Sequence, residues 1–301
     1  MLMRLLACAL VLSAALVLPA EAGASPTPVT AWYMYGDSAS ALRSYAYSHG
    51  CSFAQEQPNA SLRVLLLDFG AARKLDSSTW GAVDFSNTRF SNAEILAALE
   101  RAADGYHNCH VRGAVDVVYG TSNYHLSDSG MSTTDAWHAG YHQSERAEDL
   151  HDYQVSRGYS SQTSDAAGDM EPSWDGPLIT KQLVNGNQGQ GWALYYDFGS
   201  ADGCPQSGSA DGGCNNGWRV SDVGYVSFHG LAVPLPEVYY GVNASQWTVV
   251  RKWWDGAQSS DYFFGGVTAS TGVGLTPAAA WNALESLNGG LVDPELVCFG
   301  C

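Results

Sequence analysis

The run LRVLLLDFG at residues 62–70 decides the fold class of this chain. Its apolar side chains are continuous rather than alternating, which is typical of a strand buried on both faces of a parallel sheet. Aspartate and glycine, both turn residues, then end the run. Six further runs predict strands, and several of them also end in Asp or Gly: 31–37, 115–123, 166–171, 191–199, 235–241 and 263–269.

Segments with helical spacing separate these strands, whereas residues 80–90 are expected to form a loop. The helices are predicted at 39–48, 95–106 (after the helix-start sequence SNAE at 91–94), 135–155, 178–184, 220–231, 244–254 and 276–287. Strands that alternate with helices predict one α/β domain built on a parallel sheet, and we place it at residues 25–301. An irregular or incomplete (β/α)8 barrel, TIM-like in type, fits this length, and an open doubly wound sheet is the alternative.

The stretch AAGDMEPSW at residues 166–174 carries the strongest chemical signal. Side chains two positions apart on a strand point the same way, so Asp169 and Glu171 would lie about 6–7 Å apart. One carboxyl can then act as an acid while the other acts as a base, nucleophile or electrostatic partner. The alternative is that this Asp-x-Glu triplet is a solvated loop with no chemical role.

Other polar residues follow the remaining strands. The carboxyl ends of barrel strands meet at one face, where the active sites of such barrels lie. We therefore expect these ends to bring further residues around Asp169 and Glu171, namely Asp37, Asp68, Asn123 and Asp197, with Trp174, Tyr196 and Tyr240 close by. Each acid taken alone is equally well explained as a helix cap or a turn residue.

The N-terminus reads as a secretory signal. A short basic segment at 1–4 precedes an apolar run at 5–18 and the cleavage-site sequence Ala20-Glu21-Ala22. Residues 1–24 are therefore predicted to be removed, and the remaining protein is expected to be secreted, extracellular and free of the membrane. The six cysteines after Cys8 then predict disulfides, which we pair as Cys51–Cys109, Cys204–Cys214 and Cys298–Cys301.

The charge balance narrows the choice of partners. A formal net charge of −16 disfavours nucleic acid and anionic membranes. Ten Trp and sixteen Tyr provide rings that build packed cores or sugar-binding platforms. No metal is predicted, because the pair His138 and His142 lacks the glutamate of a zinc-protease motif. No strand is followed by a nucleotide-binding glycine loop, so we expect no cofactor, and we take the protein as a monomer by default.

The strand ends resemble those of glycoside-hydrolase barrels. Gly36-Asp37 and the segment 168–172 are similar to the family 25 lysozymes (muramidases), which carry Asp-x-Glu on the fourth strand and another Asp at the end of the first. Chitinase-type barrels of family 18 also end this strand in Asp-x-Glu, but place a further Asp where this chain has Ala167. The chain also resembles secreted actinobacterial proteins that share Gly203-Cys204-Pro205 and Leu235-Pro236-Glu237, a likeness that implies no known activity.

The lysozyme resemblance implies roles for individual residues. Glu171 would be the general acid that protonates the glycosidic oxygen. Asp169 would stabilise the oxocarbenium-like transition state or orient an N-acetyl group, and Asp37 would support them. Sequence spacing leaves both retaining and inverting reactions open.

Three functions follow as hypotheses. The first is a secreted glycoside hydrolase that cleaves a polysaccharide, either peptidoglycan or another amino-sugar polymer, by carboxylate acid/base catalysis. The second is a barrel that binds carbohydrate without cleaving it. The third is a structural or interaction protein of the cell surface.

Overall fold

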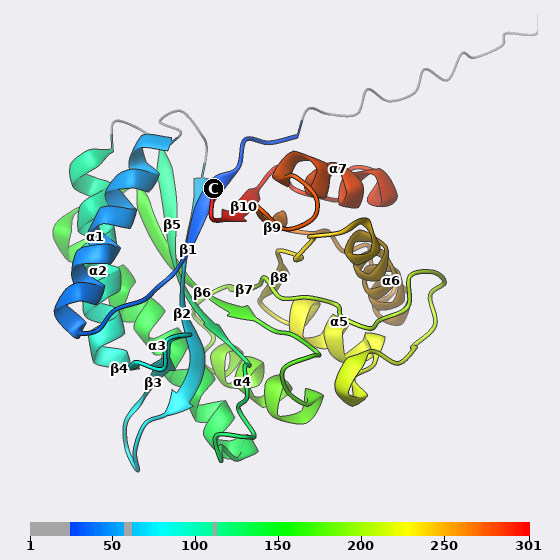
Figure 1. Ribbon diagram of the computed structural model, residues 1–301, viewed down its shortest axis with the longest axis horizontal. Helices are drawn as coiled ribbons and strands as arrows, with labels where there is room; N and C mark the ends of the chain where they lie inside the picture. Colours follow the sequence, from blue (N-terminus) through cyan, green and yellow to red (C-terminus); the bar gives the residue numbers. More distant parts are fainter. Residues whose placement is uncertain (1–24, 57–61, 111–112) are drawn as a thin grey trace, which may run out of the picture.

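The computed structural model describes residues 25–56, 62–110 and 113–301, so the predicted signal peptide lies outside the described residues. Strands and helices alternate along the chain, as shown in Figure 1. Their order is β1 (Val29–Tyr33), α1 (Ala39–Glu56), β2 (Leu62–Lys74), β3 (Trp80–Val83), β4 (Arg89–Ser91), α2 (Asn92–Cys109), β5 (Ala114–Ser122), α3 (Thr133–Arg157), β6 (Gln162–Asp169), α4 (Pro177–Gln190), β7 (Tyr195–Asp197), α5 (Val220–Phe228), β8 (Ala232–Pro234), α6 (Gly241–Gln258), β9 (Val267–Ser270), α7 (Pro277–Asn288) and β10 (Leu296–Phe299).

Eight of the described strands form one curled parallel sheet in the order β8-β7-β6-β5-β2-β1-β10-β9. Continuous strand pairing stops between β8 and β9, so the paired strands form a half-barrel and not a closed barrel. Contacts that cross this opening include an isolated parallel bridge between Glu237 and Thr268, a 2.8 Å bond from the Gly265 N–H to the Pro234 carbonyl, and a 2.8 Å bond from Thr268 Oγ1 to the Leu235 carbonyl. The predicted α/β fold with a parallel sheet is confirmed, and the half-barrel is consistent with both a TIM-like arrangement and an open parallel sheet.

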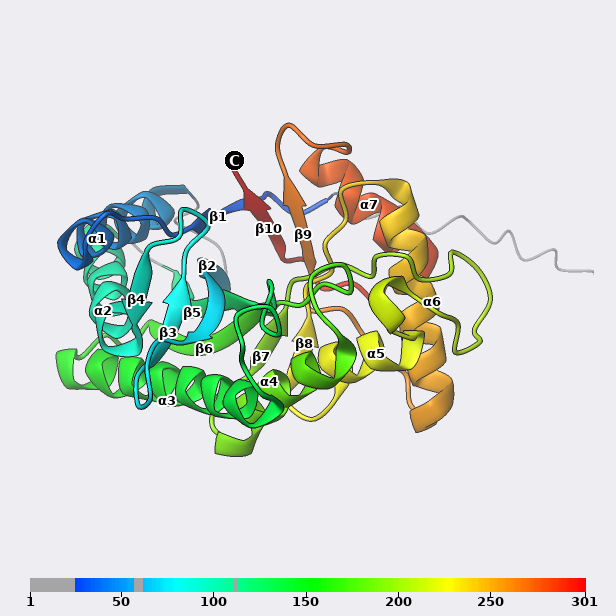
Figure 2. The same ribbon diagram turned by 60° about the horizontal axis from the view of Figure 1, so that its bottom comes forward.

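The helices surround the convex side of this sheet. Helices α1 and α2 cover one end, and α5, α6 and α7 cover the other (Figure 1). Figure 2 shows α3 and α4 running side by side beneath the strands. Their backbones approach closely at Gly140 of α3, where a Cβ would lie 1.8 Å from the Leu183 carbonyl oxygen of α4. The concave side of the sheet is therefore left for the residues at the strand ends.

Several sequence predictions about secondary structure are wrong. Residues 80–90 form a hairpin of β3 and β4, because the Asp84 side chain accepts bonds from the N–H groups of Ser86 (2.9 Å) and Thr88 (2.8 Å) and so closes a tight turn. The strand expected at 235–241 lies instead at Ala232–Pro234 (β8), and Pro236 lacks the N–H group that would continue the pairing. Strand β10 was not predicted at all.

Helix α1 also extends beyond its predicted end. Gly50 does not stop it, because this glycine marks the crossing with α2, where a Cβ would lie 2.1 Å from the Ala102 carbonyl oxygen. At the start of α2, the predicted cap is confirmed: Ser91 accepts a bond from the Glu94 N–H, and the Glu94 carboxylate accepts one from the Ser91 N–H.

All three predicted disulfides are confirmed. Cys51–Cys109 joins α1 to α2, Cys204–Cys214 closes the loop that follows β7, and Cys298–Cys301 ties the C-terminus to β10. Disulfides form in oxidising compartments, so these pairs are compatible with the predicted export. Within the described ranges, none of the helices combines the length and the apolar character needed to span a bilayer.

Candidate active site

Three carboxylates meet at the carboxyl ends of the parallel strands. Asp169 is the last residue of β6, Glu171 follows it, and Glu237 lies in the segment after β8. One oxygen from each of the three lies within 4.8 Å of the others. We call Asp169, Glu171 and Glu237 the carboxylate cluster.

Strand register explains why Asp169 points toward this cluster. In the parallel sheet, Asp169 is aligned with Ser122 of β5, and Asp68 of β2 is aligned with Gly120. Ser122 and Gly120 are two positions apart, so Asp68 and Asp169 share the concave face of the sheet. Gly168 points the opposite way, where a Cβ would lie 1.8 Å from the Tyr195 hydroxyl oxygen. The lack of a side chain at Gly168 therefore makes room for the Tyr195 ring of the neighbouring strand β7.

Asn123 holds the backbone of Glu171. Its Nδ2 donates to the Glu171 carbonyl at 3.0 Å and to Thr180 Oγ1 at 3.0 Å, while its Oδ1 accepts from the Glu171 N–H at 3.0 Å. The Asn123 side chain is fully buried. Asn123 therefore lies next to Glu171. Its amide faces the protein backbone and positions Glu171.

Exposure divides the carboxylate cluster into two layers. Asp169 is only 2% exposed and Glu171 is 9% exposed, whereas Glu237 is partly exposed. One oxygen of Asp169, Oδ1, has no hydrogen-bond partner among the described residues, and the same is true of Asp68 Oδ2. Glu237 is therefore the most accessible of the three carboxylates, and Asp169 is the most deeply buried.

Burial and mutual repulsion favour the protonated forms of these acids. Burial, followed by the charge of Asp202, raises the pKa of Glu171 to about 7. Burial and then the charge of Glu171 raise the pKa values of Asp169 and Glu237 well above the ordinary carboxyl range. Burial and repulsion therefore favour protons on these neighbouring acids, and their titrations are linked.

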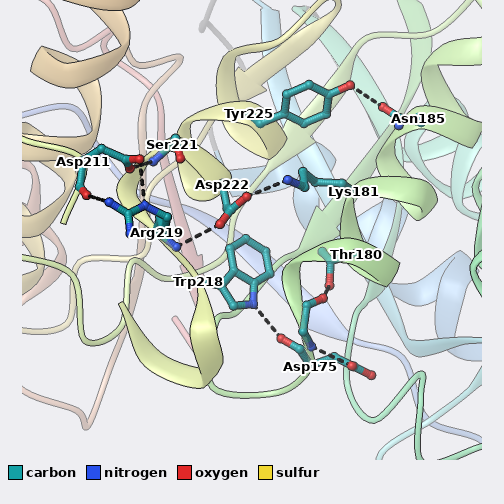
Figure 3. Close-up of polar contacts among 11 residues, drawn as sticks. Asp175, Thr180, Lys181, Asn185, Asp211, Trp218, Arg219, Ser221, Asp222 and Tyr225 are labelled. Carbon is teal, nitrogen blue, oxygen red and sulfur yellow. Dashed lines mark hydrogen bonds and ion pairs between the residues drawn. The ribbon is translucent and has the colours of Figure 1, made fainter. Parts of the chain in front are cut away.

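The disulfide-closed loop after β7 forms a wall beside the cluster. Ser173, in the segment after Glu171, donates to the Asp202 carboxylate at 2.9 Å and accepts from Asn215 Nδ2 at 3.1 Å. At the end of this loop, the buried Trp218 donates its indole N–H to the Asp175 carbonyl at 2.6 Å (Figure 3). These bonds join the loop to the segment that carries Glu171.

Ion pairs anchor the same loop to the helices. Arg219 Nε lies 2.8 Å from Asp211 Oδ2, and Lys181 of α4 lies 2.6 Å from Asp222 of α5 (Figure 3). Asp202, whose charge contributes to the raised pKa of Glu171, is itself held by Ser173 Oγ, which donates to its carboxylate, and by the Asn215 N–H, which donates to its carbonyl at 3.0 Å.

Several predicted site residues lie outside the cluster. Asp37 is exposed in the loop after β1. Asp197 is aligned with Gly168, so it points to the helical side of the sheet, where Ser227 of α5 donates to its carboxylate. Tyr196 faces the concave side but lies deeper, near Asp116 and Asp165, whose charges and the burial of the ring raise its pKa. These placements correct the expectation that all strand-end residues converge.

The predicted aromatic residues take two positions at the rim. Trp174 is partly exposed, and its ring meets Tyr124 edge-on at 5.4 Å between centroids. Tyr240 is exposed at the start of α6, where its N–H donates to Asn243 at 2.8 Å.

Three residues of the site were missed from the sequence. Glu237 is a full member of the cluster, and Tyr33 and Tyr239 border it. Burial and then the charge of Asp169 raise the pKa of Tyr33, while burial and then Glu237 raise that of Tyr239. An available signal for Glu237 was its place beside Pro236 at a predicted strand, which parallels Glu171 beside Pro172.

The chain matches no protein-family model, and no curated protein is significantly similar to it. Its function must therefore be argued from the geometry of the site.

Proposed function

We propose that this protein is a glycoside hydrolase that cleaves a polysaccharide, with peptidoglycan or another amino-sugar polymer as its substrate. The observation that carries the proposal is the pair formed by Glu171, whose pKa is raised to about 7, and Glu237, with carboxylate oxygens within 4.8 Å. A carboxyl that keeps its proton near neutral pH suits a general acid. The resemblance of the strand ends to those of family 25 lysozymes also supports this assignment.

The chemistry uses the cluster in a partly ionised state. When one proton has left the cluster, a carboxylate charge lies next to a carboxyl group that can still donate. In the productive microstate of these coupled acids the remaining proton lies on Glu171, which donates it to the glycosidic oxygen as the bond to the leaving group breaks, while the carboxylate of Glu237 stabilises the oxocarbenium-like sugar or forms a glycosyl ester that water then hydrolyses. Asp169, the most deeply buried of the three, lies beside this pair. A separation below about 5 Å is nearer to the spacing of retaining than of inverting enzymes.

Substitution of Glu171 tests the proposal. Wild-type protein is expected to clear suspensions of purified peptidoglycan or to release reducing ends from peptidoglycan or chitin. The Glu171→Gln variant should lose activity by a factor of about 10²–10⁴, which is the usual contribution of a general acid. Glu285→Gln, on the outer helix α7, is the matched control and should keep full activity, with equal melting temperatures showing that both variants fold. Wild-type rates in Glu171→Gln would exclude Glu171 as the acid.

The second candidate is a protein that binds carbohydrate without cleaving it. A row of exposed rings at the same strand ends favours it: Phe85 meets Tyr124 at 6.3 Å, and Tyr124 meets Trp174 at 5.4 Å between centroids. If wild type releases nothing from either polymer while Trp174→Ala weakens glycan binding, this candidate replaces the hydrolase.

A further inference from the structure

A second concave feature opens beside the carboxylate cluster. It is a cavity of about 590 Å³ between the loop after β1, helix α1 and the β3–β4 hairpin. Its walls include Trp32, Tyr33, Tyr35 and Tyr45, together with Asp37 and His49. Tyr35 and Tyr45 are 46% and 53% exposed, so their rings are available to a ligand. We call this feature the aromatic cavity.

Tyr33 connects the aromatic cavity to the carboxylate cluster. It lines the cavity, and it is also close enough to Asp169 for that charge to raise its pKa, after the larger effect of burial. Its ring stacks on Phe299 at 4.3 Å and meets Phe85 edge-on at 5.3 Å. Tyr33 therefore places the aromatic cavity next to the carboxylate cluster.

The aromatic cavity has no positively charged wall. Neither lysine nor arginine is among its lining residues, and Asp37 places an exposed carboxylate at its edge. His49 stacks on Trp32 at 4.6 Å, and burial lowers its pKa to about 4, so it is neutral at pH 7. With a net charge of −16 on the whole chain, an anionic ligand is disfavoured.

Aromatic faces and a carboxylate together attract one kind of group. Ring faces bind cations through their quadrupole, and they also cover the apolar face of a ring-shaped ligand. A carboxylate beside them adds an ion pair to a positive charge. A sugar ring bearing an ammonium group presents both features to the cavity.

We propose that the aromatic cavity binds an amino sugar whose amine is free and protonated, with Asp37 pairing the ammonium group and Tyr35 and Tyr45 packing on the ring. This inference rests on the proposed function only in taking the ligand to be a sugar. It narrows the substrate class to polysaccharides that contain de-N-acetylated hexosamines.

The test is calorimetric binding in the Glu171→Gln background, where bound oligosaccharide is not cleaved. A glucosamine tetrasaccharide is expected to bind at least about tenfold more tightly than its N-acetylated counterpart, and more weakly as salt screens the charge. Asp37→Asn should reduce its affinity by about fivefold, and Tyr35→Ala or Tyr45→Ala by about three- to tenfold. Asp261→Asn and Phe263→Ala, at exposed positions in the segment after α6, are matched controls and should change nothing.

The outcomes separate this inference from the proposed function. Equal affinity for both tetrasaccharides, or no effect of Asp37→Asn, would overturn the inference even if wild type hydrolyses polysaccharide. Preferred binding of glucosamine oligomers, sensitive to Asp37 and Tyr35, would uphold it even if wild type cleaves nothing. Tighter binding of a tetralysine peptide than of the glucosamine oligomer would reassign the cavity to a basic peptide.

Discussion

Replacing Asp68 by asparagine tests the electrostatic account of the concave face. Asp68 lies on β2 and is fully buried. Its Oδ1 accepts a 2.9 Å bond from the Gly70 N–H, whereas its Oδ2 has no hydrogen-bond partner in the described part of the chain. Burial raises its pKa from the ordinary 3.8 to about 7. Asparagine keeps the shape and the accepting oxygen but never carries the charge.

The expected effect depends on pH because folded Asp68 holds its proton more tightly than unfolded Asp68. Its contribution to stability is fully present below about pH 4, where both states are protonated, and is lost as the pH rises through 7. Since one pKa unit corresponds to about 1.4 kcal/mol, the loss is on the order of 4 kcal/mol above pH 7. We therefore expect Asp68→Asn to be more stable than wild type at pH 8, by up to that amount.

Urea unfolding followed by tryptophan fluorescence at pH 5 and pH 8 measures this difference. At pH 5 the wild-type penalty is small, so the two proteins should differ by less than about 1–2 kcal/mol. Asp261→Asn, an exposed aspartate, is the control and should shift stability little at either pH. The reasoning is refuted if Asp68→Asn changes the free energy of unfolding equally at both pH values, or if it destabilises the protein more at pH 8.

Three further predictions concern packing and loops. Asn123→Ala should lower the free energy of unfolding by about 3 kcal/mol in urea titrations, because three hydrogen bonds of a buried amide are lost; a loss below about 1 kcal/mol would contradict the role given to Asn123. Gly140→Ala should lower the free energy of unfolding by about 3 kcal/mol or more in the same assay, because its Cβ would overlap α4. The control Gly256→Ala, whose Cβ would have nothing within 4 Å, should be neutral or stabilising, and equal effects of the two substitutions would refute the close helix crossing. Replacing both Cys204 and Cys214 by serine should lower the free energy of unfolding by about 3 kcal/mol in thermal unfolding, because the disulfide, which joins residues with a sequence separation of 10, no longer restrains the unfolded chain. An unchanged melting temperature would show that Trp218 and Arg219 hold the loop without the disulfide.

Local patterns were sufficient for much of the fold. The continuous apolar run at 62–70 predicted a buried parallel strand, and the alternation of strands with helices predicted the α/β class. The start of α2 was readable from Ser91 and Glu94 because a capping box is a contact between residues three positions apart. Nearness in sequence also paired Cys204 with Cys214, and Cys298 with Cys301, correctly.

Errors arose where the outcome depended on distant segments. The last strand, β10, is only four residues long and exists because β1 and β9 pair with it on either side. Gly50 looked like a helix stop, but it serves the crossing of α1 with α2. A glycine has the same local preferences in either role, and only the neighbouring helix decides between them.

The sequence by itself determined that Asp169 and Glu171 stand together at the carboxyl end of one strand, although the strand ends at Asp169 and Glu171 follows it. The tertiary structure alone decided which face each strand end presents and which other ends reach the same point. Asp197 points toward α5, and Tyr196 lies deeper on the concave face. Glu237 belongs to the carboxylate cluster although it lies in a different segment, the one after β8. The physical reason is that side-chain alternation is a property of one strand, whereas register and sheet curvature arise from pairing between strands that are far apart in the chain.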